Sequence, residues 1–119
     1  ATNKMINIVS SSRYKINRKY IKKKSEEIML QRGISDNNDI NIAFIGKIKM
    51  KVIVEKYKKE DEALPIITFK YNEQQGDNKM LGEIIICYPY AVLLAAERNK
   101  RVDDMILNLI DHGIKNLSL

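Results

Sequence analysis

The side chains that carry most acid–base and metal chemistry are scarce in this chain of 119 residues. It has one histidine, His112, and one cysteine, Cys87. A metal site or acid–base pair built from several histidines is therefore excluded for these residues. Taken alone, His112 is most simply a structural or incidental residue of the last predicted helix. Cys87 ends an apolar stretch, which is typical of a small buried side chain rather than of a nucleophile.

Glycine spacing excludes a second class of chemistry. The five glycines, at positions 33, 46, 76, 82 and 113, lie far apart in the sequence. Phosphate-binding loops need several glycines close together so that the backbone can approach the phosphates. The sequence thus has no nucleotide-binding fingerprint, and we expect no nucleotide cofactor.

The charge balance is moderately basic. Lys and Arg number 21 against 15 Asp and Glu, which gives a net charge of +6. Lysine dominates the cations, and three lysines are adjacent in a predicted helix: Lys22, Lys23 and Lys24. A lysine is a hydrated point charge suited to a solvated surface, whereas arginine is favoured for bidentate phosphate contacts. The run is therefore either a solvated helix face or a phosphate-binding surface, and composition permits a nucleic-acid partner.

Hydrophobic runs in the chain are short. None approaches the roughly 20 apolar residues that a membrane helix needs, and the first five residues have no apolar signal region. A lone cysteine fits a reducing compartment. We expect one domain over residues 1–119, in the cytoplasm and without a membrane partner.

Residue periodicity predicts eight elements. Strands are expected over residues 5–9, 39–45, 66–71 and 81–87, with a polar loop over 72–79. Helices are expected over 14–32, 47–59, 89–99 and from about 102 to near the end of the sequence. The first helix should bury Ile16, Tyr20, Ile28 and Leu30, and the last should bury Met105, Ile106, Leu109 and Ile110. The order βαβαββαα defines an α+β fold, a small mixed four-stranded sheet with helices packed on it.

A strand, a helix that starts at a proline and a second helix with a histidine–glycine pair follow one another over residues 81–113. The strand contains Leu81-Gly82-Glu83-Ile84, and the second helix contains Asp111-His112-Gly113. These segments resemble the YbeY family, whose members have a Leu-Gly-Asp-Ile strand and a later helix bearing His-Gly-x-x-His. Upstream, residues 50–61 and 65–69 are similar to a family stretch of Leu-Asn-x-x-Tyr-Arg-x-x-Asp followed by Thr-Asp-Val-Leu-Ser-Phe-Pro. The resemblance covers the chain from about Asp39.

The resemblance implies rRNA processing and ribosome biogenesis in a bacterial cytoplasm, by a family regarded as metal-dependent endoribonucleases of single-stranded RNA. In that family two histidines four residues apart, and a third further on, hold a metal that is taken to be zinc. Here His112 takes the first position, Asn116 takes the second, and the third would fall beyond Leu119. An amide is a poor zinc ligand beside imidazole, and Lys115 adds positive charge. We therefore expect a degenerate zinc site and no bound cofactor.

Other family positions are also changed. The family's arginine after the tyrosine of the second helix corresponds to Lys58 after Tyr57, which keeps the charge but loses the bidentate fork. The family's asparagine in that helix falls on Val54. Its Thr-Asp pair falls on Leu64-Pro65, and its serine falls on Thr68. Polar cleft residues are thus replaced or softened while the scaffold is kept.

Two functions stay open at this point, and with them the question of whether the chain is an enzyme. The first is a YbeY-like rRNA maturation factor whose hydrolase activity is weak, altered or lost. Lys58 would bind phosphate, and His112 would act as an acid–base group or as a metal ligand shared with substrate, in a groove between the second and last helices. Glu83, expected at the end of the paired strands, is a weaker candidate for this site and is more simply interpreted as structural. The second function is a non-catalytic factor that binds RNA or a ribosomal protein through the same groove.

Overall fold

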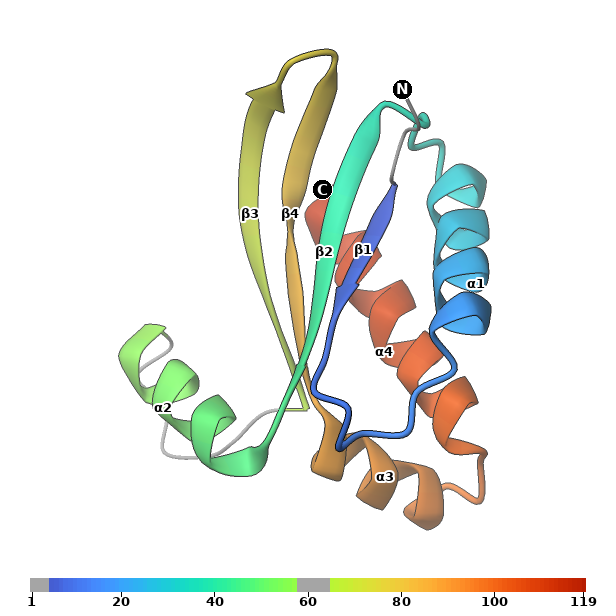
Figure 1. The fold of residues 1–119 in the computed structure, drawn as a ribbon, viewed down its shortest axis with the longest axis vertical. Coiled ribbons are helices and arrows are strands. Elements are labelled where there is room, and N and C mark those ends of the chain that lie inside the picture. The colour runs from blue at the N-terminus through green and yellow to red at the C-terminus, as the bar shows by residue number, and fades with distance from the viewer. Residues whose placement is uncertain (1–4, 58–64) are drawn as a thin grey trace.

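The computed structural model describes residues 5–57 and 65–119, and within them eight elements follow one another along the chain (Figure 1). They are β1 (Ile6–Val9), α1 (Arg18–Gln31), β2 (Asn38–Ile45), α2 (Lys47–Tyr57), β3 (Ile66–Gln75), β4 (Asn78–Cys87), α3 (Tyr88–Glu97) and α4 (Val102–Leu117). The expected order βαβαββαα and the α+β class are confirmed. None of the described helices is long and apolar enough to cross a membrane.

The four strands form one mixed sheet of order β1-β2-β4-β3. β1 pairs with β2 and β2 with β4 in parallel, whereas β3 pairs with β4 antiparallel. The two central strands carry the longest hydrophobic stretches because both of their faces are covered over much of their length. β3 is the antiparallel edge strand, and the last six of its residues are exposed.

Successive side chains of a strand point to opposite faces of the sheet, and this divides the core in two. Ile84 and Ile86 of β4 pack with α1, α3 and α4 in the larger core. Ile85 and Cys87 pack with Met50 and Val54 of α2 in a smaller core. Figure 1 shows the same arrangement, with α1 and α4 against one face and α2 against the lower part of the other.

The first helix differs from its predicted form. Asn17 caps α1, since its side chain accepts a hydrogen bond from the Tyr20 backbone N–H at 3.2 Å, so the helix begins four residues later than expected. Ile16 therefore precedes the helix. Tyr20 and Leu30 are exposed, and their predicted burial was wrong. The buried side is formed by Ile21, Ser25 and Met29, spaced four apart.

The expected polar loop over residues 72–79 is mostly strand. β3 runs to Gln75, β4 begins at Asn78, and the turn between them is Gly76-Asp77. Gly76 has a φ of +63°, a conformation that glycine adopts without strain. Polar residues are tolerated in this hairpin because the strand pairing satisfies their backbone groups while their side chains remain in water. In the last helix, by contrast, the predicted burial of Met105, Ile106, Leu109 and Ile110 is confirmed.

Candidate functional site

Two glycines of the sequence motifs lie where α4 packs against the sheet. A Cβ atom on Gly113 would lie 2.8 Å from Cδ1 of Ile84. A Cβ atom on Gly82 would collide with the backbone oxygen of Phe69 and would lie 2.8 Å from Cδ2 of Leu117. Both positions thus have space only for hydrogen, and this close contact sets the position of α4 relative to β4.

This contact determines where His112 lies. The residues of α4 that face the sheet include Ile110, Gly113 and Leu117, all buried. His112 and Asn116 lie on the exposed side of the helix. They are four residues apart, so the two side chains project from neighbouring turns of the same face. The structure therefore brings these two predicted site residues together.

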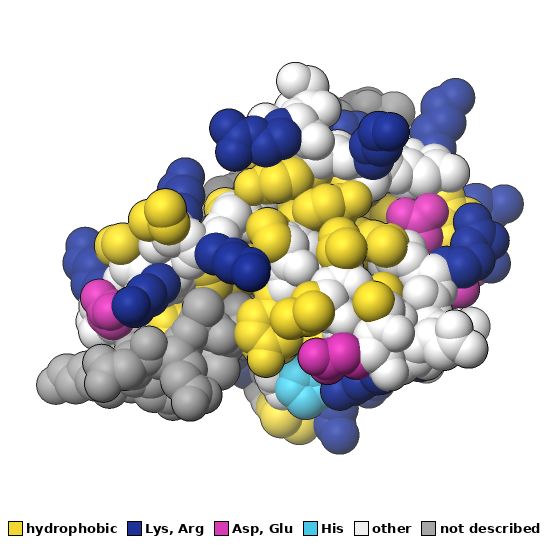
Figure 2. Space-filling model, turned by 90° about the horizontal axis from the view of Figure 1, so that it is seen from below, with side chains coloured by type: hydrophobic (Ala, Val, Ile, Leu, Met, Phe, Trp, Pro, Cys, Tyr) yellow, Lys and Arg dark blue, Asp and Glu magenta, His cyan; other side chains and the backbone are white. Residues whose placement is uncertain are grey.

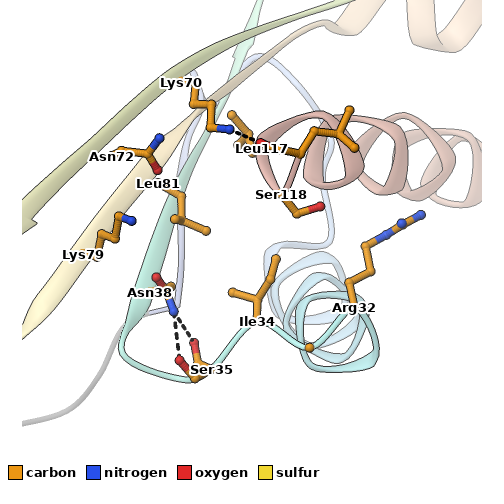
Figure 3. Close-up of a pocket in the computed structure, with 12 residues that line it drawn as sticks. Arg32, Ile34, Ser35, Asn38, Lys70, Asn72, Lys79, Leu81, Leu117 and Ser118 are labelled. Carbon is orange, nitrogen blue, oxygen red and sulfur yellow. Dashed lines mark hydrogen bonds between the residues drawn. The ribbon is translucent and has the colours of Figure 1, made fainter.

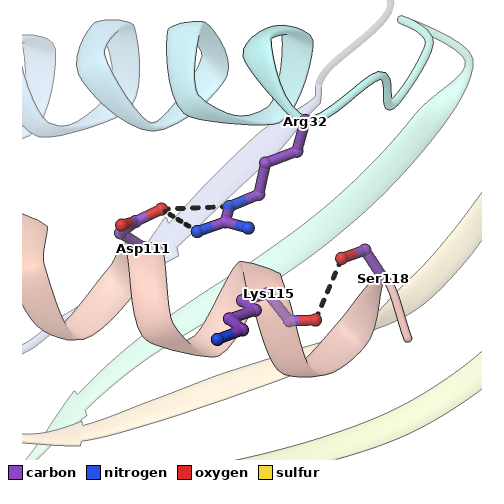
Figure 4. Close-up of polar contacts among 4 residues, drawn as sticks. All are labelled: Arg32, Asp111, Lys115 and Ser118. Carbon is purple, nitrogen blue, oxygen red and sulfur yellow. Dashed lines mark hydrogen bonds and ion pairs between the residues drawn. The ribbon is translucent and has the colours of Figure 1, made fainter.

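The residues around His112 do not fit a three-histidine zinc site. Asn116 offers a neutral amide on the next turn, and the neighbouring carboxylate of Asp111 is already engaged. Figure 4 shows that Nε and Nη2 of Arg32 donate to Oδ1 of Asp111 at 3.0 and 2.9 Å, which ties the end of α1 to α4. Within residues 5–57 and 65–119, no three His, Cys, Asp or Glu side chains are grouped as a metal site requires.

A cavity of about 440 Å³ lies beside the end of α4 (Figure 3). Its described lining includes three cationic side chains and no Asp or Glu. The cations come from different elements: Arg32 follows α1, Lys70 is in β3 and Lys79 is in β4. Lys70 donates to the backbone oxygen of Leu119. Sequence reasoning missed this group because its members are far apart in the chain and only the fold gathers them.

The lysine run of the first helix is partly neutralised. Nζ of Lys22 lies 2.9 Å from a carboxylate oxygen of Glu26, and Nζ of Lys24 lies 3.4 Å from one of Glu27. Lys23 is exposed and makes no ion pair with any described residue. The run therefore presents less net positive charge than its sequence indicates.

Basic residues also stand at the end of the molecule formed by α3. Figure 2 views this end from below and shows hydrophobic side chains gathered there, with Lys and Arg side chains around them. Val92 and Leu93 of α3 are among the exposed hydrophobic residues. The basic excess of the chain is thus distributed over several faces.

The second helix and the last helix pack on opposite faces of the sheet. Their described parts consequently do not form the two walls of one groove, as the sequence had suggested. Lys58, the predicted phosphate ligand, lies outside the described residues, and Tyr57 is the last residue of α2. Glu83 lies in the middle of β4 and not at its end, and it points to the α2 face, away from His112. The structure thus separates Glu83 from the helix that carries His112.

Cys87 is fully buried at the junction of β4 and α3. Burial raises the pKa of its thiol, while a hydrogen bond with the Tyr90 backbone and the charge of Lys47 act in the opposite direction. Fewer thiolates form in such a site, and the side chain behaves as the small buried residue that the sequence predicted.

The chain is a protein of the α+β class, in which a helix packs closely on a mixed four-stranded sheet at two glycines. The solution structure of TM1509 from Thermotoga maritima shares this fold, with a TM-score of 0.66 and 23% sequence identity, over 97% of this chain and 73% of that one. A family model described as Endoribonuclease YbeY matches residues 5–117. The chain belongs to the YbeY family, and the resemblance seen in its sequence is confirmed.

Two curated relatives show how divergent the chain is. It is 25% identical to Endoribonuclease YbeY of Azoarcus sp. (strain BH72) over 73% of this chain and 36% of that protein. It is 27% identical to Endoribonuclease YbeY of Sulfurihydrogenibium sp. (strain YO3AOP1) over 86% of this chain and 67% of that protein. The aligned part of the chain thus spans about a third of the first relative and about two thirds of the second.

Proposed function

We propose that this chain acts in rRNA maturation as a YbeY-type protein that binds single-stranded RNA, with a nuclease activity that is weak or altered. The observation that carries the proposal is the family match over residues 5–117, which includes the whole β4–α4 unit. The names of the relatives add support, since both are called endoribonucleases. We also propose a bacterial cytoplasm as its location, and RNA and a ribosomal protein as its partners.

The reduced activity follows from the residues on α4. Asn116 replaces an imidazole by an amide, and Arg32 occupies the carboxylate of Asp111. His112 then acts as an exposed acid–base group for the RNA backbone, without a metal. Lys58 contributes a phosphate contact, on the strength of its sequence position after Tyr57. Lys22, Lys23 and Lys24 are further candidates for phosphate contacts, and Lys23 is the least neutralised of them.

A second candidate function is a non-catalytic factor that binds RNA or a ribosomal protein. The observation in its favour is the same amide at position 116, because binding does not require the family's metal ligands. The cavity beside the end of α4 supports either candidate, since Lys70 and Lys79 line it and lysines attract phosphate groups. Its third cation, Arg32, is already paired with Asp111.

The experiment combines metal analysis with RNA cleavage. The purified protein is incubated with single-stranded rRNA fragments, with and without chelator, and its zinc content is measured. The first candidate predicts slow cleavage that survives the chelator and decreases in His112→Ala. Asn108→Ala is the matched control, because Asn108 is an exposed residue one turn earlier on α4.

The outcomes separate the candidates. Binding without any cleavage supports the non-catalytic factor. Stoichiometric zinc together with chelator-sensitive cleavage contradicts the proposed loss of the metal site. No binding to RNA or ribosomal particles at low salt contradicts both candidates.

A further inference from the structure

The described residues, 5–57 and 65–119, cover one face of the sheet only in part. On the α4 face, Ile6, Ile42 and Ile84 are completely buried. On the other face, β1 exposes Asn7 and leaves 56% of Val9 accessible. Figure 1 shows the reason, since α2 covers only the lower part of this face. A sheet face with exposed side chains is available to a ligand.

Aromatic side chains gather on this partly covered face. A cavity of about 370 Å³ between α2 and the sheet is lined by Ile53, Tyr57, Phe69, Tyr71, Glu83 and Ile85. Tyr57 and Phe69 meet edge to face, with ring centroids 5.1 Å apart. Tyr57 is 56% exposed and Tyr71 is 44% exposed. Exposed aromatic rings beside an apolar cavity are the usual platform for stacking an unpaired base.

The charged group in the described lining of this cavity is the carboxylate of Glu83. Its Oε1 accepts a long hydrogen bond from the Tyr71 hydroxyl at 3.4 Å. No Lys or Arg among the described residues forms an ion pair with it. An ionised carboxylate only accepts hydrogen bonds. The remaining lone pairs of Glu83 therefore select a ligand that presents N–H donors.

Positive charge is concentrated on α2, the helix that forms one wall of this cavity. The described helix α2 carries one carboxylate, Glu55, against four lysines at positions 47, 49, 51 and 56. Nζ of Lys56 lies 5.3 Å from the ring centroid of Tyr57. A nucleotide whose base stacks at Tyr57 would thus have its phosphate close to a cation. The aromatic surface, the acceptor and the cation thus match the flat face of a base, its N–H edge and the phosphate of a nucleotide.

We propose that this cavity binds an unpaired guanine of single-stranded RNA, with the base stacked on Tyr57 and Tyr71 and its N–H edge on Glu83. The inference rests on the proposed function, since it supplies that RNA with a second contact on the sheet face opposite His112. Guanine presents two adjacent donors, N1–H and the N2 amine, to a carboxylate. Uracil presents carbonyl oxygens on both sides of its single N–H, and these repel Glu83.

The test measures binding of short uridine oligonucleotides that differ only in the central nucleoside, which is guanosine, inosine, adenosine, cytidine or uridine. Guanine is expected to bind tightest and uracil weakest. Inosine lacks the N2 amine and falls between them. Fluorescence anisotropy at one fixed salt concentration gives the affinities, because salt alone changes them.

Two variants locate the effect. Glu83→Gln keeps the shape of the side chain and is expected to weaken guanine binding by about tenfold. Uracil binding should not weaken and should rise, because the repulsion between its carbonyl oxygens and the carboxylate is removed. Tyr57→Leu is expected to weaken binding of all the oligonucleotides by about tenfold, because stacking does not depend on the base. Glu97→Gln and Tyr20→Leu are matched controls, since both are exposed residues on other elements. Circular dichroism verifies that each variant is folded.

The failures are distinguishable. RNA binding without preference for guanine, or with a preference that survives Glu83→Gln, overturns the guanine site and leaves the proposed function standing. Absence of binding to any of the oligonucleotides overturns both. A methyl NMR spectrum decides the location, because Ile53 and Ile85 line the cavity and their signals are expected to shift with the guanine oligonucleotide. Unshifted signals overturn the site.

Discussion

Position 116 holds the single residue with the largest expected effect on metal binding. His112 and Asn116 are both exposed and one helical turn apart. Asn116→His would place two imidazoles on the same helix face, and we expect the affinity for zinc to rise at least about tenfold, by analogy with paired histidines of helical metal sites. Competition with a chromophoric chelator measures this affinity.

The control for this prediction is Asn116→Gln, which retains an amide. Its zinc affinity should equal that of the parent protein. The gain in Asn116→His should increase from about pH 6 to about pH 8, because zinc binds the neutral imidazole and competes with protons. Equal zinc affinities in both variants would show that the site lacks more than its second ligand.

The phenol of Tyr71 gives a second prediction at the residue scale. Its pKa is raised above 10.0, first by burial, then by the charge and hydrogen bond of Glu83, with smaller contributions from Glu73 and Tyr57. Glu83→Gln should lower this pKa toward 10.0 without reaching it, because burial remains. A titration of the tyrosine Cζ signals by NMR measures the change.

The sign of the linked stability change follows directly. The folded chain holds the Tyr71 proton more tightly than the unfolded chain, so the contribution of this group is present below pH 10.0 and is lost as the pH rises through the raised pKa. Glu83→Gln should shrink this alkaline loss. A pKa that stays unchanged in the variant would mean that Glu83 and Tyr71 are not in contact in solution.

Ser25 explains why the buried face of α1 was predicted wrongly from the sequence. It is fully buried on α1, and its hydroxyl has no hydrogen-bond partner among the described residues. A polar residue at the centre of the buried face interrupts the hydrophobic pattern, so the sequence favoured Tyr20 and Leu30 instead. Ile21 and Met29 did indicate the buried face, because they are eight residues apart, which is two steps of the i, i+4 pattern.

At the scale of elements, the contact between α4 and β4 is expected to be sensitive to added volume. Gly113→Ala places a methyl group against Ile84, and we expect it to destabilise the fold by about 1–3 kcal/mol, the usual cost of overpacking. Ile84→Val removes the Cδ1 atom that lies 2.8 Å from the new Cβ. The double variant should thus be more stable than the sum of the single effects indicates.

Urea unfolding of the four proteins measures this coupling. Gly82→Ala serves as the severe comparison, since its Cβ would meet the backbone of β3, which cannot move aside as a side chain can. Strict additivity of the two single substitutions would contradict the proposed contact. The test also bears on the site, because this contact positions His112.

The elements with strong periodicity were predictable, and those with polar sequences were not. β2, β4 and α4 follow their hydrophobic patterns because burial decides their structure. The hairpin that joins β3 and β4 has few hydrophobic residues and is stabilised by backbone pairing. Backbone pairing does not depend on residue type, so the sequence did not indicate strands there. The start of α1 depended on one capping side chain, Asn17.

At the scale of the whole molecule, the sequence located the motifs but not their relative positions. His112 was predicted on the last helix, and it is there. That Glu83 faces α2 while His112 belongs to the opposite layer depends on which side of the sheet each helix covers. Local patterns do not contain this information. The three cations of the cavity beside α4 were invisible for the same reason.

The distribution of charge over several faces leads to the last prediction. Only the cations that touch RNA release counterions on binding, and each phosphate contact on a single strand adds about 0.7 to the slope of log affinity against log salt concentration. Lys56→Ala should therefore reduce that slope by roughly this amount. Lys100→Ala, on the exposed loop between α3 and α4, should leave it unchanged. Lys23→Ala decides between the two interpretations of the lysine run: a reduced slope indicates that α1 contacts phosphate, and an unchanged slope indicates a solvated helix face. Binding indifferent to salt in the parent protein would contradict a phosphate-based interaction altogether.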